Sequence, residues 1–331
     1  MSDRPLGDLS IDPLLDVELE LGMAQVEEAI REAVVSDYPF VTEASRHLVD
    51  AGGKRFRPLL VLLASQFGEG VTPDVIKAAV VVELTHLATL YHDDVMDEAA
   101  LRRGAPSANA RWDNSVAILT GDFLFARASD VLADLGPEAV RIQARTFERL
   151  CVGQIRESVG PAAGVDPVEH HITVLADKTG SLIATSGRFG AMMAGASDEV
   201  IAVMTAFGEA IGVAFQLADD IVDITSESVQ SGKTPGTDLR EGVPTLAALY
   251  ALNGTEPDDQ RLRELLSRPL PDDAEHAEAL AAIRMHPSLQ EARMQAHEWS
   301  NSARDLLVTL PDVPARKALE ALCDYVVNRT G

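Results

Sequence analysis

Apolar residues recur three and four positions apart along most of the chain, which is the spacing that buries one face of an α-helix. The longest runs of this kind predict helices at residues 17–35, 78–97, 115–135, 139–159, 166–194 and 199–224. No stretch of the sequence shows the sustained alternation, rich in β-branched residues, that predicts a strand. The pattern therefore predicts an all-α protein.

Breaks in this pattern predict where the loops lie. Gly52-Gly53 ends one helix, and Pro58 suits the first turn of the next helix. Residues 102–106 predict a loop, and residues 228–244, rich in glycine and proline, predict a mobile loop. Residues 253–273 are polar and predict a surface connection.

Domain organisation follows from where the motifs lie. Residues 1–16 predict a loose lead-in. The motifs described below are spread from residue 52 to residue 240, so a division into two domains would split them. We therefore expect residues 17–331 to form a single helical domain.

Composition narrows the possible partners. The 331 residues carry a formal net charge of −24, which makes nucleic acid and anionic membrane surfaces unfavourable partners. Cys151 and Cys323 give neither a metal-ligand spacing nor a disulfide framework, and we expect Cys151 to lie in the core. Glu83 and His86 interrupt the apolar run at residues 78–90, which argues against a transmembrane segment. We expect a soluble, cytoplasmic protein.

Two acidic motifs follow long apolar runs. One is Asp93-Asp94-Val95-Met96-Asp97, and the other is Asp219-Asp220-Ile221-Val222-Asp223. Residues four apart lie on one helical face about 6 Å apart, so each motif brings two carboxylates together. Such carboxylates repel one another unless a cation lies between them, and Mg²⁺ often binds carboxylates together with substrate phosphates. One such motif alone is commonly a solvated face, but two that end apolar helices suggest a diphosphate held by metal ions between two helices.

Cations gather near glycines and close in sequence to these motifs. They lie in residues 52–58, 102–104, 178–180 and 232–233. Arginine offers bidentate donors to phosphate, and lysine offers a compact charge. Any one of these cations alone would be read as a surface ion pair that contributes little. In so acidic a chain, their grouping indicates phosphate binding.

Two polar residues share a helical face with the acidic motifs. His86 lies seven residues before Asp93, which is nearly two turns, and Gln216 lies three residues before Asp219. A histidine on an apolar helix is commonly a core residue. For Gln216, a structural role as a buried, hydrogen-bonded side chain and a functional role are equally supported. Beside a diphosphate, His86 could donate a hydrogen bond.

Taken in order, these segments resemble the trans-isoprenyl diphosphate synthases. The shared set runs from Gly-Gly-Lys-Arg-Phe-Arg-Pro at residues 52–58, through both acidic motifs, to Gly232-Lys233. The resemblance implies a large bundle of helices around a central cavity, a homodimer, and condensation of isopentenyl diphosphate with an allylic diphosphate. It also implies three Mg²⁺ per active site, with Mn²⁺ as an alternative.

The resemblance further implies a role for each matched residue. The implied metal ligands are Asp93, Asp97 and Asp219, supported by Asp94, Asp220 and Asp223. The implied ligands of the allylic diphosphate are Arg102, Lys178, Thr179, Gln216 and Lys233. The implied ligands of isopentenyl diphosphate are Lys54, Arg57, His86 and Arg103.

The residues before the first acidic motif bear on product length. In the family that the chain resembles, a bulky aromatic four or five residues before the first aspartate closes the product tunnel. Here those positions are Thr89 and Ala88, and Thr85 and Val82 lie further back; all four are small or medium in size. Five residues of helix rise about 7.5 Å, so we expect an open tunnel and a long-chain polyprenyl diphosphate, of the kind that forms quinone side chains.

Other functions fit parts of this pattern. A short-chain synthase that makes geranylgeranyl or farnesyl diphosphate keeps the same chemistry. A head-to-head or cyclising enzyme is disfavoured by residues 52–58, which serve isopentenyl diphosphate in the family. A non-catalytic partner subunit is disfavoured because both acidic motifs are intact. A helical module that binds metal or phosphate without turnover would bind metal but form no product.

Overall fold

The computed structural model describes residues 12–226, 235–254 and 259–328. Helices make up 78% of these described residues, which confirms the all-α class. The chain divides into two compact units. Unit 1 comprises residues 1–147, 182–208 and 309–319, and unit 2 comprises residues 148–181, 209–308 and 320–331. The expectation of a single domain from residue 17 onward stays a prediction.

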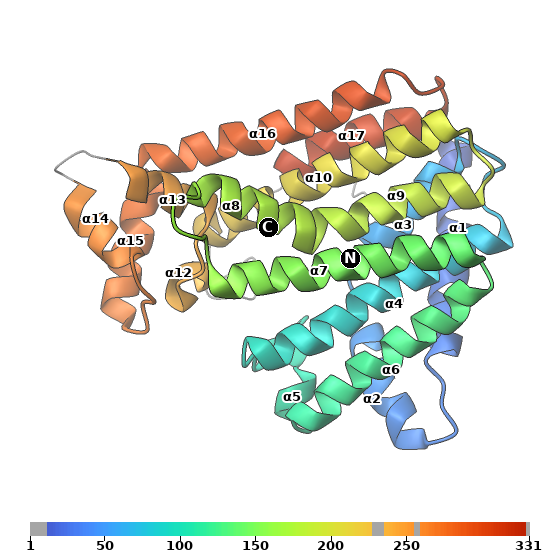
Figure 1. The fold of residues 1–331 in the computed structure, drawn as a ribbon, viewed down its shortest axis with the longest axis horizontal. Coiled ribbons are helices and arrows are strands. Elements are labelled where there is room, and N and C mark those ends of the chain that lie inside the picture. Colours follow the sequence, from blue (N-terminus) through green and yellow to red (C-terminus); the bar gives the residue numbers. More distant parts are fainter. Residues whose placement is uncertain (1–11, 227–234, 255–258, 329–331) are drawn as a thin grey trace. The chain divides into compact units, whose positions relative to one another are not determined.

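The helices of each unit are traced in Figure 1. Unit 1 contains α1 (Pro13–Ala33), α2 (Pro39–Asp50), α3 (Phe56–Ser65), α4 (Pro73–Met96), α5 (Ala108–Arg111), α6 (Asn114–Ala133) and most of α9 (Ser181–Met193). Unit 2 contains α8 (Pro167–Leu175), the π-helical turn η1 (Ala176–Gly180), α12 (Thr237–Glu241), α13 (Leu246–Asn253), α14 (Gln260–Leu266), α15 (Asp273–Met285) and α16 (Pro287–Leu307). Like α9, whose first residue belongs to unit 2, the helices α7 (Pro137–Val159), α10 (Asp198–Thr225) and α17 (Pro314–Asn328) have residues in both units.

The first helix begins earlier than the sequence pattern predicts. The Asp12 carboxylate accepts hydrogen bonds from the backbone N–H groups of Leu14 and Leu15, and Pro13 takes the first helical position. An aspartate cap followed by proline is a strong start signal, because the first backbone donors of a helix lack partners within it. The lead-in therefore ends before Pro13, and residues 1–11 lie outside the described part of the chain.

α4 is the central buried helix of unit 1. The Thr72 hydroxyl accepts a hydrogen bond from the Val75 backbone N–H at 3.3 Å and so caps its first turn. Its side chains are buried nearly all round, as predicted. α4 lies beside α6. The imidazole ring of His92 in α4 packs against Gly121 of α6, where a Cβ would lie 2.4 Å from Nε2 of His92, so the close approach depends on glycine. The first acidic motif thus ends a helix that close packing holds in place.

The segment predicted as a loop at residues 102–106 is part of a short hairpin. β1 (Leu101–Arg102) pairs antiparallel with β2 (Ala105–Pro106), with Arg102 opposite Ala105. The two residues between the strands, Arg103 and Gly104, have φ angles of 54° and 76°. Positive φ at both central positions is the geometry of the tightest hairpin turns, and it reverses the chain within two residues.

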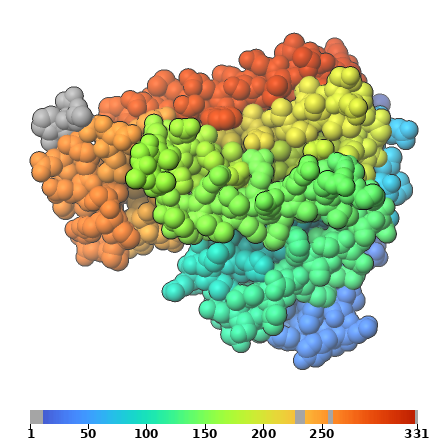
Figure 2. Space-filling model, viewed as in Figure 1, coloured from blue at the N-terminus to red at the C-terminus, as the bar shows by residue number. Residues whose placement is uncertain are grey.

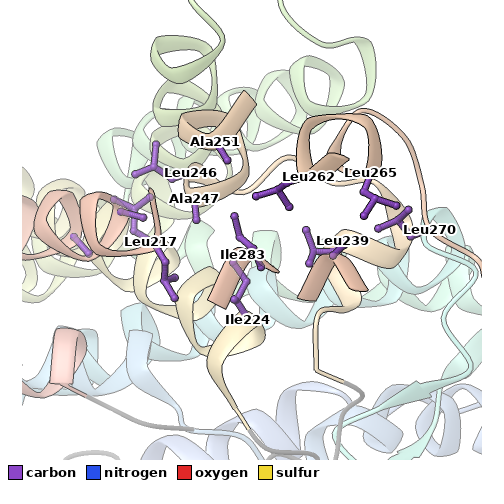
Figure 3. Close-up of a cluster of buried hydrophobic side chains, with 14 of the residues drawn as sticks. Leu217, Ile224, Leu239, Leu246, Ala247, Ala251, Leu262, Leu265, Leu270 and Ile283 are labelled. Atoms are coloured by element: carbon purple, nitrogen blue, oxygen red, sulfur yellow. The ribbon is translucent and has the colours of Figure 1, made fainter. Parts of the chain in front are cut away.

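Unit 2 has its own apolar core, shown in Figure 3. Side chains from α10, α12, α13, α14, α15 and α16 meet there; those labelled include Leu217, Leu239, Leu246, Leu262 and Ile283. Because Leu262 and Leu265 of α14 are buried in this core, residues 253–273 are not merely the surface connection that their polarity predicted.

Three further expectations need correction or lie partly outside the structure. Residues 166–194 are not one α-helix, because η1 interrupts them. Cys151 is exposed rather than in the core, since the buried positions of α7 include Gln143, Thr146 and Leu150 and Cys151 falls one residue off that stripe. Of the predicted mobile loop, residues 228–234 lie outside the described residues, while α12 forms in its second half.

Among the residues that the structure describes, two helices are long and apolar enough to cross a membrane by length and composition. They are α4 and α10, and 67% and 50% of their respective apolar windows are buried within the protein. The buried core helix of a soluble protein passes the same test, so two such helices are weak evidence for a membrane span.

Candidate active site

The first acidic motif occupies the last turn of α4. A backbone hydrogen bond of 2.8 Å from Asp97 N to Asp93 O places these two residues one helical turn apart, and Asp97 ends the helix. The C-terminal end of a helix carries partial negative charge, so carboxylates there are unfavourable unless a cation is near. The motif is therefore placed where it favours the binding of a cation.

Asp94 differs from its two neighbours in the motif. Its side chain is fully buried, and Oδ1 accepts a hydrogen bond of 2.6 Å from Nε of Arg102 in β1. Burial raises the pKa of Asp94, while the Arg102 guanidinium opposes that shift. Arg102, predicted to bind the allylic diphosphate, is thus held beside the motif, with Nη2 4.0 Å from Oδ2 of Asp97.

A basic cluster forms a second feature of unit 1. Its members are Arg57 of α3, His86 of α4 and Arg103 at the hairpin turn. The guanidinium of Arg103 donates to the backbone oxygens of Leu48, at 2.9 Å, and of Gly52. A Cβ on Gly53 would lie 2.7 Å from Cζ of Arg103, so only glycine leaves room for this arrangement.

The pKa values of this cluster indicate an anion site. The pKa of Arg57 is lowered to about 10, chiefly by burial; the negative charge of Glu83 opposes this shift and the positive charge of Arg103 adds to it. Burial, and then Arg57 and Arg103, hold the pKa of His86 well below its ordinary value. Nε of Arg57 is buried without a hydrogen-bond partner among the described residues. A bound anion would offset the repulsion between these like charges and give this donor a partner.

The other two cations of residues 52–58 behave differently. Arg55 is buried and pairs with Glu27 at 2.5 Å and with Glu83 at 2.8 Å, so it stabilises unit 1 instead of facing a ligand. Lys54, predicted to bind isopentenyl diphosphate, is exposed beside the glycine pair. The family resemblance gave a role to Lys54 and none to Arg55, and the structure shows that Arg55 is occupied by ion pairs within unit 1.

The second acidic motif occupies the last two turns of α10 and belongs to unit 2. Asp220 is buried, and its Oδ1 accepts a hydrogen bond of 3.1 Å from Nε2 of Gln216. Oε1 of Gln216 in turn accepts a hydrogen bond of 3.2 Å from the Thr179 hydroxyl. These three predicted site residues therefore form one hydrogen-bonded chain.

Two backbone donors fix Asp223, the last aspartate of this motif. Its two carboxylate oxygens accept hydrogen bonds from Thr237 N at 3.3 Å and from Asp238 N at 3.2 Å, at the start of α12. Asp223 therefore joins the end of α10 to the segment that follows the loop. Lys233, also predicted to bind the allylic diphosphate, lies outside the described residues.

Lys178 and Thr179 lie in the π-helical turn η1. Nζ of Lys178 forms an ion pair of 2.6 Å with Glu157 of α7, and Nε2 of Gln154 donates to the same carboxylate oxygen at 3.1 Å. The sequence analysis did not find Glu157 and Gln154, because Glu157 and Lys178 are 21 positions apart along the chain and their contact depends on the fold. A diphosphate near Lys178 would compete with Glu157 for its charge.

The four predicted tunnel residues lie along α4. Val82, Thr85 and Ala88 are buried, and Thr89 is half-buried. The Thr85 hydroxyl accepts a hydrogen bond of 2.7 Å from Nε2 of Gln143 in α7. Gln143 is a polar neighbour of this row that the sequence did not reveal.

Comparison with known proteins identifies the family. The chain matches the polyprenyl synthetase family over residues 38–283. It belongs to the polyprenyl synthetase family. Nonaprenyl diphosphate synthase of Mycobacterium tuberculosis is 50% identical to this polyprenyl synthetase over 323 residues, which cover 97% of this chain and 96% of that protein. The predicted enzyme class, a prenyltransferase of the long-chain type, is confirmed.

Solved structures agree with this assignment. A geranylgeranyl pyrophosphate synthase from Corynebacterium glutamicum, complexed with calcium and isoprenyl diphosphate, is 48% identical, with a TM-score of 0.87 and coverage of 97% of this chain and 98% of that one. A decaprenyl diphosphate synthase from Rhodobacter capsulatus is 33% identical, with a TM-score of 0.87 and coverage of 96% and 98%. This polyprenyl synthetase is thus similar to proteins named for both short and long products.

The donor set of this polyprenyl synthetase fits a hard divalent cation only together with a substrate. Within residues 12–226, 235–254 and 259–328, no group of three or more His, Cys, Asp or Glu side chains is arranged to hold a metal alone. Asp93 and Asp97 supply carboxylate oxygens one turn apart, which suits Mg²⁺ that takes its other ligands from phosphate and water.

One buried histidine was missing from the predicted site. Nε2 of His171 in α8 lies 3.6 Å from Oδ2 of Asp220 and lacks a hydrogen-bond partner among the described residues. It packs against the carboxylate that Gln216 also orients. No sequence pattern signals this contact, because His171 lies 49 residues before Asp220.

Proposed function

We propose that the chain condenses isopentenyl diphosphate with an allylic diphosphate, head to tail and in trans configuration, to give a long-chain polyprenyl diphosphate. The single observation that carries this proposal is the basic cluster of Arg57, His86 and Arg103. Nε of Arg57 is buried there without a hydrogen-bond partner among the described residues, and burial together with neighbouring positive charges lowers the pKa values of all three side chains, which makes the cluster a site for a strongly charged anion. We assign this site, together with Lys54, to the diphosphate of isopentenyl diphosphate.

The allylic diphosphate is assigned to the residues nearest the acidic motifs. Family resemblance supports Arg102, Lys178, Thr179, Gln216 and Lys233 as its ligands, and Mg²⁺ bound by Asp93, Asp97 and Asp219 as its metal, with Mn²⁺ as an alternative. Mg²⁺, when bound, supplies Lewis-acid stabilisation of charge on the leaving diphosphate. Asp94 supports Arg102, and Asp220 and Asp223 hold Gln216 and the start of α12.

The chemistry follows from these assignments. The C–O bond of the allylic substrate breaks and its electron pair leaves with the diphosphate, where Arg102 and Lys178 stabilise the added charge. The double bond of isopentenyl diphosphate attacks the allylic cation and forms the new C–C bond. This attack leaves the positive charge on the isopentenyl unit. A C–H bond next to the charged carbon then breaks, its electron pair forms the new double bond, and we assign acceptance of the proton to the departed diphosphate. Apolar walls protect the cation from water.

One incubation tests the proposal. Purified protein with Mg²⁺, isopentenyl diphosphate and farnesyl diphosphate should give a ladder of products that ends well beyond C20 by mass spectrometry. A ladder that stops at C20 would keep the enzyme class and replace the long-chain product by geranylgeranyl diphosphate. Metal binding without any product would favour the non-catalytic partner subunit.

We also propose a homodimer and a cytoplasmic location, with the product used for a quinone side chain. α6, which lies at the surface in Figure 2, leaves Ile118 42% and Leu119 65% exposed. Neighbouring apolar side chains at the surface favour coverage by a second copy. Sedimentation equilibrium of the wild type and of Leu119→Glu tests this, because a dimer covered on this face should dissociate in the variant.

A further inference from the structure

The π-helical turn η1 is held where a regular α-helix would otherwise continue. The Ser181 backbone N–H donates to the oxygen of Ala176, five residues back instead of four. Turns of this type are rare, appear singly within α-helices, and are frequent at functional sites. Lys178 and Thr179, the proposed ligands of the allylic diphosphate, are both in it. The residues that contact η1 therefore determine how these two side chains are presented.

α7 approaches η1 unusually closely. A Cβ on Gly153 would lie 2.9 Å from the backbone nitrogen of Lys178 and 3.0 Å from Cβ of Asp177. Contacts this short require a side chain or the backbone to shift, so the approach depends on glycine at this position. The two arginines four residues before and three residues after Gly153 lie on the same face of α7.

These two arginines hold Asp177 from both sides. Nε of Arg149 donates to Oδ1 of Asp177 at 2.9 Å, and Nη1 of Arg156 donates to Oδ2. Nη2 of Arg149 also reaches the backbone oxygen of Ala176 at 3.4 Å. Asp177 is itself buried, so its carboxylate has exchanged water for these two guanidinium groups.

Arg149 extends the same network to α10. Its Nη1 and Nη2 donate to the two carboxylate oxygens of Glu209 at 3.2 and 2.9 Å. Glu209 lies seven residues before Gln216, which is about two turns of one helix. Since Gln216 accepts the hydrogen bond from Thr179, Arg149 joins the two elements that carry this pair.

We propose that Arg149 and Asp177 are positioning residues for the allylic diphosphate. Their ion pair, with Arg156 and Glu209 as outer partners, keeps η1 in its π form and so holds Lys178 and Thr179 in place. This inference rests on the proposed function of Lys178. Neither Arg149 nor Asp177 contacts the substrate itself in this scheme.

The test compares substrate parameters in matched variants. Arg149→Met and Asp177→Asn should each raise the KM for the allylic diphosphate about tenfold or more, the loss expected when a charged hydrogen bond is removed. The KM for isopentenyl diphosphate should change less than about twofold, the scale of a change remote from a binding site. Arg149→Lys keeps the charge but loses the bidentate fork, so it should recover only part of the loss. Arg141→Met, on the same helix and in a surface pair with Glu138 at 2.7 Å, is the control and should leave both parameters unchanged.

A second readout separates positioning from loss of structure. Isothermal titration with inorganic diphosphate and Mg²⁺ should show weaker binding in Arg149→Met, in protein whose circular dichroism matches the wild type. The double variant Arg149→Met/Asp177→Asn should be no worse than either single variant, because both remove the same contact. An equal rise of both KM values, or a lowered Tm with unchanged KM values, would overturn the inference.

Lys178→Ala distinguishes this inference from the proposed function. If Lys178→Ala raises the allylic KM and Arg149→Met does not, the positioning role fails and the function stands. If Lys178→Ala leaves the allylic KM unchanged, the assignment of Lys178 itself fails, whatever the Arg149 variants do.

Discussion

The buried carboxylate of Asp94 accepts a 2.6 Å hydrogen bond from Nε of Arg102, eight residues later across the turn that follows α4. Asp94 therefore differs in function from Asp93 and Asp97, although all three belong to one motif. Its role is to hold an arginine beside the motif, and the arginine in turn shields its charge.

The first prediction separates the three aspartates. Asp93→Asn and Asp97→Asn should each lower kcat about 100-fold or more at saturating Mg²⁺, since lost metal stabilisation costs several kcal/mol of the barrier. Asp94→Asn should lower kcat less than about tenfold and should lower the free energy of unfolding by about 1–3 kcal/mol, because removing one member of this ion pair leaves the Arg102 guanidinium without its counter-charge. Steady-state kinetics over a series of Mg²⁺ concentrations checks the effects on kcat, and urea unfolding checks the effect on stability. Equal loss in all three variants would make Asp94 a metal ligand.

The second prediction concerns Gly53. Gly53→Ala places a methyl group 2.7 Å from Cζ of Arg103 at a φ of +135°, so Arg103 must move away from the basic cluster. The KM for isopentenyl diphosphate should rise about tenfold, the effect of one lost charged hydrogen bond. Gly136→Ala is the control, because Gly136 also has a positive φ, of +92°, but has nothing within 4 Å of the added methyl. A similar rise of KM in both variants would point to backbone strain instead of crowding.

The third prediction is a pH dependence of stability. The pKa of His86 is well below its ordinary value in the folded state, so the unfolded chain binds this proton first as the pH falls. The stabilisation from neutral His86 is complete above about pH 6.5 and is lost below it, with a slope of up to about 1.4 kcal/mol per pH unit. His86→Gln should remove this part of the pH dependence of the unfolding free energy, measured by urea denaturation between pH 5 and 7. His297→Gln, at an exposed position, is the control and should leave this pH dependence unchanged. A slope that His86→Gln leaves unchanged would place the titration elsewhere.

The fourth prediction concerns Tyr91 of α4. Its buried hydroxyl donates to Ala44 O at 2.6 Å and accepts from Leu48 N at 3.2 Å, so it joins α4 to α2. Tyr91→Phe leaves two buried backbone groups without this partner and should lower the free energy of unfolding by about 1–3 kcal/mol. Tyr38→Phe, at a side chain that is 65% exposed, should have little effect. Urea denaturation of both variants and the wild type measures the effect. Equal midpoints for Tyr91→Phe and the wild type would show that water replaces the lost hydroxyl.

The fifth prediction concerns product length. A ring at Ala88 or at Thr89 should narrow the proposed tunnel, so Ala88→Phe and Thr89→Phe should shorten the product ladder. Ala88 is buried, and its extra bulk should also cost about 1–3 kcal/mol of stability, whereas half-buried Thr89 tolerates the ring better. Mass spectrometry of products from folded protein measures this. An unchanged length in both variants would mean that the growing chain runs along other residues.

The sequence predicted what depends on local spacing. The buried helix α4, its acidic motif and the one-turn separation of Asp93 and Asp97 all follow from helical periodicity. It gave Arg55 no role and could not reveal its ion pairs with Glu27 and Glu83, because each partner lies 28 residues away along the chain. It also missed the contacts of Arg149 and His171, whose partners are set by tertiary packing.

The basic cluster of unit 1 also bears on the trade-off between stability and function. Arg57 and Arg103 place two positive charges beside the neutral ring of His86 in a half-buried space, which lowers the stability of the fold before any ligand arrives. A diphosphate that binds there stabilises the folded state by mass action, in proportion to its concentration over its Kd. The enzyme is therefore least stable when it is ready to bind, and substitutions that relax this cluster should produce a more robust protein that is a poorer catalyst.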